Sequence, residues 1–349
     1  MKKIQISFVI LLMILFFGCS AWMDGYYASA KPHKEQNYLP DQTIMIPKDY
    51  EDVVEILENT VRSGQKKVAI SIEKIDEDWQ MYMDDAAEYI CDVYPMGTYA
   101  VSKISYAFIG ETDEELLSVD ISYSRSIADI DAVKNAQTEE EVAQILRDSL
   151  RGFHMSVAIC VADYKTLDFD QIIRDYAVQY PQYVIEIPQV SAVMYPRNGK
   201  DRIVELFFNY ENSRAALLQM KEEIRPIFEA SEIVSGEGAD MDKFARLYSF
   251  LMNYHSYTLQ TAITPAYSLL HHGVGDSNAF AMVYAAMCRQ AGLVCDVVSG
   301  TRDGKAWCWN VVQIEGETFY VDLLRCQEEG GFAYKTAQEM TGYRWNPST

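Results

Sequence analysis

The chain has 349 residues, more than a single hydrophobic core usually holds, so two or more domains are expected. Hydrophobic residues make up 49% and charged residues 23%, a balance typical of globular proteins and not of disordered chains. With 51 acidic against 30 basic residues, the formal charge is −21. Such a surface repels phosphate groups, which argues against nucleic-acid binding and against adhesion to anionic lipid through a basic face.

The first residues have the pattern of an export signal. A short positive segment, residues 1–3, precedes the apolar run 4–17, which only Gln5 and Ser7 interrupt. A helix of that length spans about 21 Å, less than the roughly 30 Å hydrocarbon core of a bilayer. The run therefore suits a signal peptide better than a permanent membrane span.

The apolar run ends in Phe-Phe-Gly-Cys-Ser at residues 16–20, which resembles the lipobox of bacterial lipoproteins with Cys19 as the lipidated residue. Gly18 fits that pattern, whereas Phe16 stands where Leu is usual. The alternatives are an ordinary signal peptide and an uncleaved anchor with an incidental Cys. In each case the bulk of the chain lies outside the cytoplasm. We expect a signal peptide at 1–18, a lipid anchor on Cys19 at the outer face of the cytoplasmic membrane, and a tether over 19–45.

The remaining cysteines are scattered through apolar stretches. They are Cys91, Cys160, Cys288, Cys295, Cys308 and Cys326. An even number in an exported protein permits disulfides, but a chain of this size does not need them, so buried free thiols are favoured. Their spacing does not resemble a zinc site and His is scarce. We therefore expect no metal and no cofactor.

Residues 52–214 contain an internal repeat. The matched pairs are Ile56-Leu57 with Ile145-Leu146, Arg62 with Arg151, Ala69-Ile70 with Ala158-Ile159, Tyr94-Pro95 with Tyr180-Pro181, Ser105 with Ser191, and Ser124-Arg125 with Ser213-Arg214. Their common order and nearly constant offset indicate a duplication. Each copy is predicted as helix, strand, helix, strand, strand, with 99–108 and 116–123 forming the first hairpin. We expect small α+β modules at 46–130 and 131–226, and neither copy has a nucleophile or a phosphate-binding loop.

The pattern changes in the C-terminal third. An amphipathic helix is predicted at 241–254, and a second helix begins near Asp276-Ser277 and runs to Gln290. A strand at 294–300, the block Trp307-Cys308-Trp309-Asn310 and a strand ending at Asp322 follow. This order resembles the bacterial transglutaminase-like domain of the papain-like thiol enzymes, over roughly residues 240–346. The resemblance implies a third α+β domain, assigned to residues 227–349.

The resemblance also implies a site, and the sequence departs from it. In that family a Cys opens a helix, a His on a following strand is the base, and an Asp orients the His. The matching positions in this chain hold Ser277, Trp307 and Asp322, so only Asp322 is retained. Ser needs a base even more than Cys does, and an indole cannot accept a proton. Catalytic residues are therefore not expected, and Ser277 or Asp276 is expected to cap the helix instead.

Two alternatives could restore a working site: His271 or His272 could reach Ser277 from the preceding segment, or Cys308 could act as nucleophile, although strand alternation turns Cys308 away from Trp307 and Trp309. An alignment shifted by one or two residues would put Asp276 or Gly275 at the nucleophile position, and neither is a Cys. The favoured interpretation is structural. Trp307 is expected to fill the space that an imidazole and a substrate would occupy, and Asp322 is expected to accept a hydrogen bond from the indole N–H or from a backbone amide.

The sequence predicts a cell-surface lipoprotein whose transglutaminase-like domain is catalytically inactive and serves as a binding or scaffolding module. Its partner is expected to be a component of the cell envelope or another exported protein. One alternative is a residual transglutaminase-like or peptidase-like enzyme that acts on peptide or amide bonds with Ser277, Asp322 and a non-standard base. Another is a spacer whose repeats bind while the C-terminal domain caps the assembly.

Overall fold

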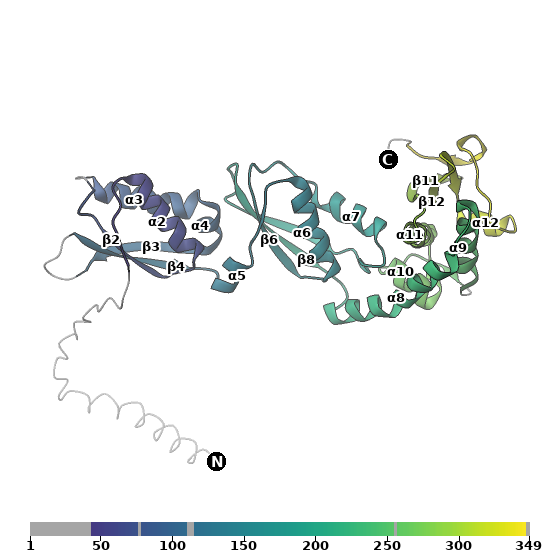
Figure 1. The fold of residues 1–349 in the computed structure, drawn as a ribbon, viewed down its shortest axis with the longest axis horizontal. Helices are drawn as coiled ribbons and strands as arrows, with labels where there is room; N and C mark the ends of the chain where they lie inside the picture. The colour runs from purple at the N-terminus through teal and green to yellow at the C-terminus, as the bar shows by residue number, and fades with distance from the viewer. Residues whose placement is uncertain (1–42, 76–77, 110–114, 255–256, 347–349) are drawn as a thin grey trace, which may run out of the picture.

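The described part of the chain forms three units that follow one another along the long axis of the molecule (Figure 1). A computed structural model describes residues 43–75, 78–109, 115–254 and 257–346. The first two units are four-stranded sheets with packed helices, and the third is a domain of helices around another four-stranded sheet. The mixed α+β class expected from the sequence is confirmed.

The first module is a sheet of order β1-β2-β4-β3, in which β1 runs parallel to β2 and the other pairs are antiparallel. Its elements are β1 (Ile44–Met45), α2 (Tyr50–Arg62), β2 (Lys67–Ser71), α3 (Trp79–Asp92), α4 (Pro95–Ala100), β3 (Val101–Phe108) and β4 (Leu116–Tyr123). Val53, Leu57 and Val61 of α2 recur at helical spacing and are buried against the sheet. The strand expected from Tyr99 begins only at Val101, because the preceding residues complete α4.

The second module has the same strand order and directions, β5-β6-β8-β7 with β5 parallel to β6. Its elements are β5 (Lys134–Ala136), α6 (Glu139–Arg151), β6 (Ser156–Val161), α7 (Phe169–Gln179), β7 (Gln189–Tyr195) and β8 (Arg202–Asn209). Helices α2 and α6 both have 13 residues. The two sheets thus share one topology, while their origin by duplication stays a prediction.

The two modules meet where α4 of the first packs on strands β7 and β8 of the second. Tyr99 and Ala100 are buried there with Ile203, and helix α5 (Ile127–Asp131) connects the modules. Arg125 crosses the junction: its guanidinium lies 2.6 Å from the buried carboxylate of Glu205 and 4.7 Å from the centre of the Tyr99 ring. Buried apolar contacts and a partly buried ion pair therefore join the modules.

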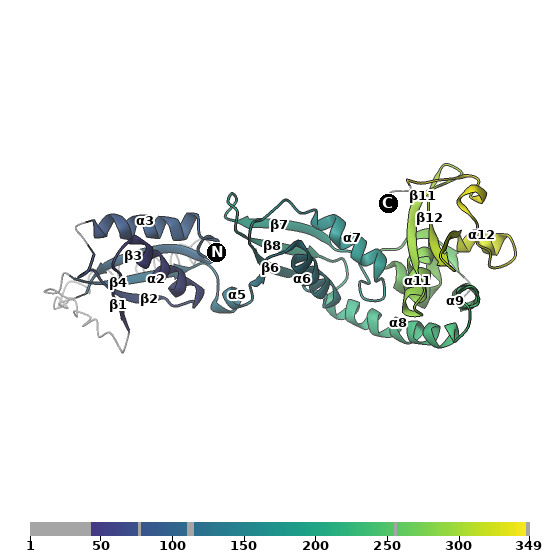
Figure 2. The ribbon, with the colours of Figure 1, turned by 45° about the horizontal axis from the view of Figure 1, so that its top comes forward.

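Helix α8 (Arg214–Ser235) leads from the second module into the third unit (Figure 2). The boundary expected between residues 226 and 227 falls inside this helix, which continues through Pro226. At the other end of the modules, Ile44 and Met45 belong to the predicted tether but pair with β2 as strand β1. Helix α8 therefore crosses the boundary that the sequence suggested at residues 226–227, and strand β1 begins the first module before the boundary suggested at residues 45–46.

The third unit wraps helices around the buried helix α11. Its elements are α9 (Asp240–Tyr254), β9 (Thr258–Leu259), α10 (Pro265–His272), β10 (Val274–Gly275), α11 (Ser277–Gln290), β11 (Cys295–Arg302), β12 (Lys305–Ile314), β13 (Glu317–Val321), α12 (Leu323–Glu328), a short 3-10 helix (Ala337–Glu339) and β14 (Tyr343–Arg344). The sheet order is β13-β12-β11-β14. Every residue of α11 from Ala279 to Cys288 is buried. Its core is continuous with the helix-side core of the second module.

Some of the predictions concern residues that the structure does not describe. The signal peptide at 1–18, the lipid anchor on Cys19 and most of the tether lie outside the described residues. No helix among the described residues is both long and apolar enough to cross a membrane. The six cysteines from Cys91 onward are free thiols in the structure, and Cys288, Cys295 and Cys326 are buried.

Candidate functional site

Ser277, the residue expected at the family's nucleophile position, lies at the start of α11. Asp276 caps the helix by accepting a hydrogen bond from the Ala279 amide at 3.0 Å, and Thr261 donates to its other carboxylate oxygen at 2.8 Å. Ser277 is the first helical residue and is partly buried, so Asp276 is the capping residue of the two expected. The Ser277 Oγ accepts a hydrogen bond from the backbone N–H of Cys308 at 3.1 Å.

Strand β12 brings residues 307–310 alongside α11. Asn310 fixes this arrangement: its buried side-chain amide donates to the carbonyl of Ala281 in α11 at 2.8 Å. Trp309 is fully buried, and its ring packs edge-on against Tyr343. Successive side chains of a strand alternate in direction, so Trp307 and Trp309 share a face and Cys308 points to the other. Trp307, the residue expected at the family's base position, directly precedes Cys308, whose amide contacts Ser277.

The carboxylate of Asp322 accepts hydrogen bonds from five groups. Its Oδ1 caps α12 by accepting from the amides of Leu324 at 3.1 Å and Arg325 at 3.2 Å. Its Oδ2 accepts from the indole Nε1 of Trp307 at 2.8 Å, the hydroxyl of Tyr343 at 2.6 Å and the guanidinium of Arg302 at 3.4 Å. The side chain is almost fully buried. A carboxylate offers about four lone-pair sites, so the capacity of Asp322 to accept is used up.

Arg302 and Tyr343 are site residues that sequence reasoning missed. Arg302 ends β11, lies with its guanidinium 5.1 Å from the centre of the Trp307 ring, and also pairs with Glu328. Tyr343 belongs to the edge strand β14, which pairs with the end of β11. Burial and the hydrogen bond to Asp322 raise the pKa of the Tyr343 hydroxyl. No sequence signal marks either residue, because only the pairing of β14 with β11 brings them to Asp322.

The imidazoles of the two neighbouring histidines lie with α8, not with Ser277. The Nε2 of His271 is 3.6 Å from the carboxylate of Glu223, and its ring stacks on Tyr267 with 4.9 Å between centres. His272 packs edge-on against the same tyrosine. In the described ranges, no imidazole is within hydrogen-bond distance of Ser277 Oγ, and His33 and His255 lie outside those ranges. The alternative in which His271 or His272 activates Ser277 therefore has no support in this geometry.

The surroundings of the Cys308 thiol disfavour a nucleophilic role. Its Sγ lies 3.5 Å from the hydroxyl of Ser299 on β11, the residue opposite it in the sheet. Burial raises the pKa of its thiol, whereas a nucleophilic cysteine needs a lowered one. Among the described residues, no group of three or more His, Cys, Asp or Glu side chains could hold a metal ion.

The match to a family model agrees with the resemblance found in the sequence. Residues 229–332 match the family model of the transglutaminase-like superfamily. Three solved structures are similar to this chain. One is described as a TGase, with 12% identity, coverage of 60% of this chain and 63% of that chain, and a TM-score of 0.29. The others are a protease candidate from Parabacteroides distasonis (13% identity, coverage of 47% and 39%, TM-score 0.24) and a cysteine protease candidate from Cytophaga hutchinsonii (12% identity, coverage of 45% and 70%, TM-score 0.25). The chain spans less than two thirds of the first two of these structures. No curated protein sequence matches it significantly. The family match places a transglutaminase-like domain in the C-terminal part of this chain, over residues 229–332.

Proposed function

We propose that this chain is an exported lipoprotein whose transglutaminase-like domain does not catalyse a reaction and serves as a binding or scaffolding module at the cell envelope. The observation that carries the proposal is the 2.8 Å hydrogen bond from the Trp307 indole to Asp322. In a thiol enzyme of this kind, the Asp holds an imidazole whose other nitrogen accepts the nucleophile's proton. An indole has a single N–H and no acceptor, so the bond to Asp322 leaves nothing for Ser277.

The surroundings of Ser277 also disfavour catalysis. A serine hydroxyl is a weak nucleophile until a base removes its proton. The only polar contact of Ser277 Oγ among the described residues is the Cys308 amide, which is a donor and stabilises the oxygen without activating it. Arg302 covers the Trp307 ring and binds Asp322, which fills the interior of the site with fixed side chains. This is the arrangement of a structural cluster.

The alternative proposal is a residual enzyme that acts on peptide or amide bonds through Ser277 and Asp322. It needs a base within about 3 Å of Ser277 Oγ, directly or through one water. The described residues supply none by direct contact, so the observations favour the binding module. The nature of the partner, an envelope component or another exported protein, follows from the expected position of the chain outside the cytoplasm.

Activity and binding are tested together on the mature chain without its signal peptide. Wild type, Ser277→Ala and the double variant Ser277→Cys/Trp307→His are incubated with cell-wall material and a labelled primary amine. We expect no label transfer and no peptide release by wild type, and saturable cosedimentation that is unchanged in Ser277→Ala. The double variant is the positive control, because it restores the family's nucleophile and base beside Asp322. Transfer by wild type that disappears in Ser277→Ala would overturn the proposal.

The membrane anchor is tested separately. Cells that express wild type or Cys19→Ala are labelled with a radioactive fatty acid, and the chain is recovered from membrane and soluble fractions. We expect labelled wild type in the membrane fraction and unlabelled Cys19→Ala. Equal labelling of both would refute Cys19 as the lipidated residue.

A further inference from the structure

Strand β5 forms the outer edge of the sheet in the second module, close to the junction with the first module. It pairs with β6 alone, and no other described strand lies on its outer side. An edge strand of this kind presents unpaired backbone groups that an extended peptide can pair with. Two hollows meet at this edge, since Gln137 and Ala162 line both of them.

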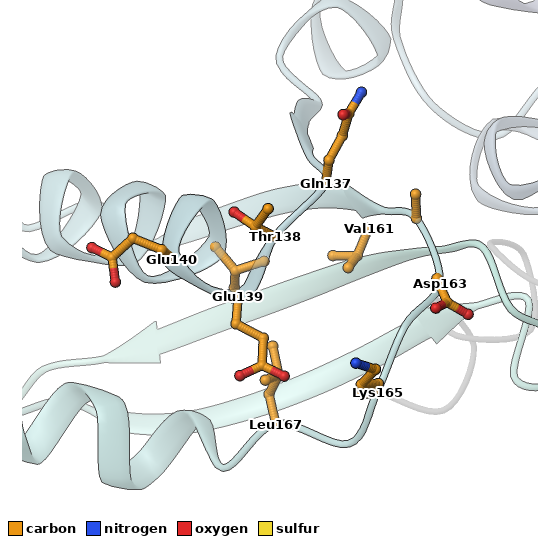
Figure 3. Close-up of a pocket in the computed structure, with 10 residues that line it drawn as sticks. Gln137, Thr138, Glu139, Glu140, Val161, Asp163, Lys165 and Leu167 are labelled. Carbon is orange, nitrogen blue, oxygen red and sulfur yellow. The ribbon is translucent and has the colours of Figure 1, made fainter.

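The first hollow has a volume of about 450 Å³ and lies between the first turn of α6 and the segment that follows β6. Figure 3 shows Glu139 and Leu167 on one side of it and Asp163 and Lys165 on the other. Val161 contributes to its wall and also belongs to the helix-side core of the module. This hollow therefore opens on the helix side of the sheet.

The second hollow has a volume of about 760 Å³ and lies between the two modules. The first module contributes an aromatic wall of Tyr89 and Tyr94, with Arg62 donating to the Tyr94 hydroxyl at 3.1 Å. The second module contributes Cys160, which packs with the apolar cluster of the junction, and Asp201. This hollow therefore opens on the opposite side of the sheet from the first.

The two hollows on opposite sides fit neighbouring side chains of one extended peptide. Successive side chains of a strand point to opposite faces of a sheet. A peptide paired along β5 would thus direct one side chain into the first hollow and the next side chain into the second. The pairing would extend the sheet by one strand, a common mode of peptide recognition.

The charge of the linings indicates what those two side chains are. Six carboxylates line the hollows, three in each: Glu139, Glu140 and Asp163 in the first, and Glu58, Asp131 and Asp201 in the second. The cations of the linings are Lys165 and Arg62, and Lys134 begins the edge strand itself. Glu140 is paired with Arg147 and Glu58 with Arg62. The other four carboxylates form no ion pair with a described cation. Tyr89 and Tyr94 also line the second hollow, and aromatic rings attract cations.

We propose that the edge strand β5, with its two hollows, binds an extended peptide segment that carries two adjacent basic residues. One basic side chain lies in the hollow of Glu139 and Asp163, and the other lies over the tyrosines near Asp131 and Asp201. The segment belongs to a partner protein. This site lies in the modules, and it stands whether or not the transglutaminase-like domain catalyses a reaction.

The test uses the mature chain and two labelled hexapeptides of equal charge and composition, with blocked ends. The first, Thr-Thr-Lys-Lys-Thr-Thr, directs its lysines to opposite faces when extended, and the second, Thr-Lys-Thr-Lys-Thr-Thr, directs both to one face. Binding is measured by fluorescence anisotropy at physiological salt, where the Debye length of about 8 Å suppresses attraction to the distant net charge. We expect the adjacent-lysine peptide to bind several-fold more tightly.

Matched variants separate this site from the general acidity of the chain. Glu139→Gln/Asp201→Asn removes one carboxylate from each hollow. Glu315→Gln/Glu317→Gln removes two exposed carboxylates, one from the turn after β12 and one from the first residue of β13. Partly exposed ion pairs are each worth about twofold to fivefold in affinity, so the first variant is expected to bind about fourfold or more weakly and the second unchanged. Equal loss in both variants, equal affinity for the two peptides, or no binding to wild type would overturn the proposal.

Discussion

Replacing Trp307 by Phe tests the view that this side chain is a structural partner of Asp322. The substitution keeps an aromatic ring on β12 and removes the Nε1–H that donates to Asp322 Oδ2 at 2.8 Å. The carboxylate stays almost fully buried, so water cannot easily replace the lost donor. The change therefore removes one hydrogen bond to a buried charge, together with part of an indole ring.

The magnitude follows from the number of donors that remain. A hydrogen bond to a charged group contributes about 1.5–3 kcal/mol to stability. Oδ2 keeps the bond from the Tyr343 hydroxyl and the contact with Arg302, which compensate in part. We expect Trp307→Phe to cost about 2 kcal/mol. Trp307→His, whose ring can still donate to Asp322, is expected to cost about 1 kcal/mol less.

The assay has to report locally, because a chain of several packed units need not unfold in one step. Urea denaturation followed by circular dichroism gives the overall effect. Hydrogen exchange at the amides of Leu324 and Arg325, which donate to Asp322 Oδ1, reports on the site itself. We expect faster exchange there in Trp307→Phe, and unchanged exchange in strand β2 of the first module.

Tyr343→Phe gives an independent check, because it removes the other uncharged donor to the same oxygen. The two substitutions share a partner, so their effects are expected to differ from additivity by at least about 0.5 kcal/mol. A Trp307→Phe variant within about 0.5 kcal/mol of wild type, with unchanged exchange at Leu324 and Arg325, would refute the structural role of the indole.

Three further substitutions test other parts of the structure. Arg125→Ala leaves the buried carboxylate of Glu205 without its cation, and we expect the free energy of unfolding in urea to fall by about 3 kcal/mol. The double variant Arg125→Ala/Glu205→Gln should recover part of that loss, and a loss below about 1 kcal/mol in the single variant would contradict the prediction. Gly300→Ala places a Cβ 2.3 Å from the carbonyl oxygen of Arg344, so we expect β14 to detach from β11. The amides of β14 should then exchange faster, and the free energy of unfolding should fall by about 3 kcal/mol. Amides of β14 that stay protected in the variant would refute the close contact. Burial raises the pKa of the Cys326 thiol to about 11, so the folded state favours the neutral thiol. The resulting stability is present below about pH 9 and is lost as the pH rises toward 11. In denaturation series over this pH interval, Cys326→Ala should therefore lose about 2 kcal/mol less stability than wild type, and an equal loss in both would contradict the prediction.

Local patterns in the sequence were sufficient to place most of the helices and strands. The helical spacing of Val53, Leu57 and Val61 is the sequence signal for α2, because a helix that packs on a core buries one stripe of its side chains. The strand predicted at 116–123 is β4, with the same bounds. The start of α11 near Asp276 followed from the side-chain cap that Asp276 provides. These signals are short-range, because the interacting residues lie within a few positions of one another.

Boundaries between the units were less predictable. Residues 226 and 227 were expected to separate two domains, but α8 runs through them, since its buried residues Leu217, Ile224 and Phe228 pack on both sides of Pro226. A proline inside a helix is a local signal for a break, and packing against neighbouring elements outweighs it here.

The sequence by itself determined the order of the C-terminal blocks, and their resemblance to the transglutaminase-like family implied Ser277, Trp307 and Asp322 at the positions of the nucleophile, the base and the orienting acid. Only the tertiary structure decided how those residues are used. The pairing of β14 with β11 brings Tyr343 to Asp322, and the packing of α10 on α8 directs His271 to Glu223. The physical reason is the distance along the chain between the interacting residues. Hydrogen-bond partners that lie tens of residues apart meet only when whole helices and strands pack together, and that packing cannot be inferred from the identity of a single residue.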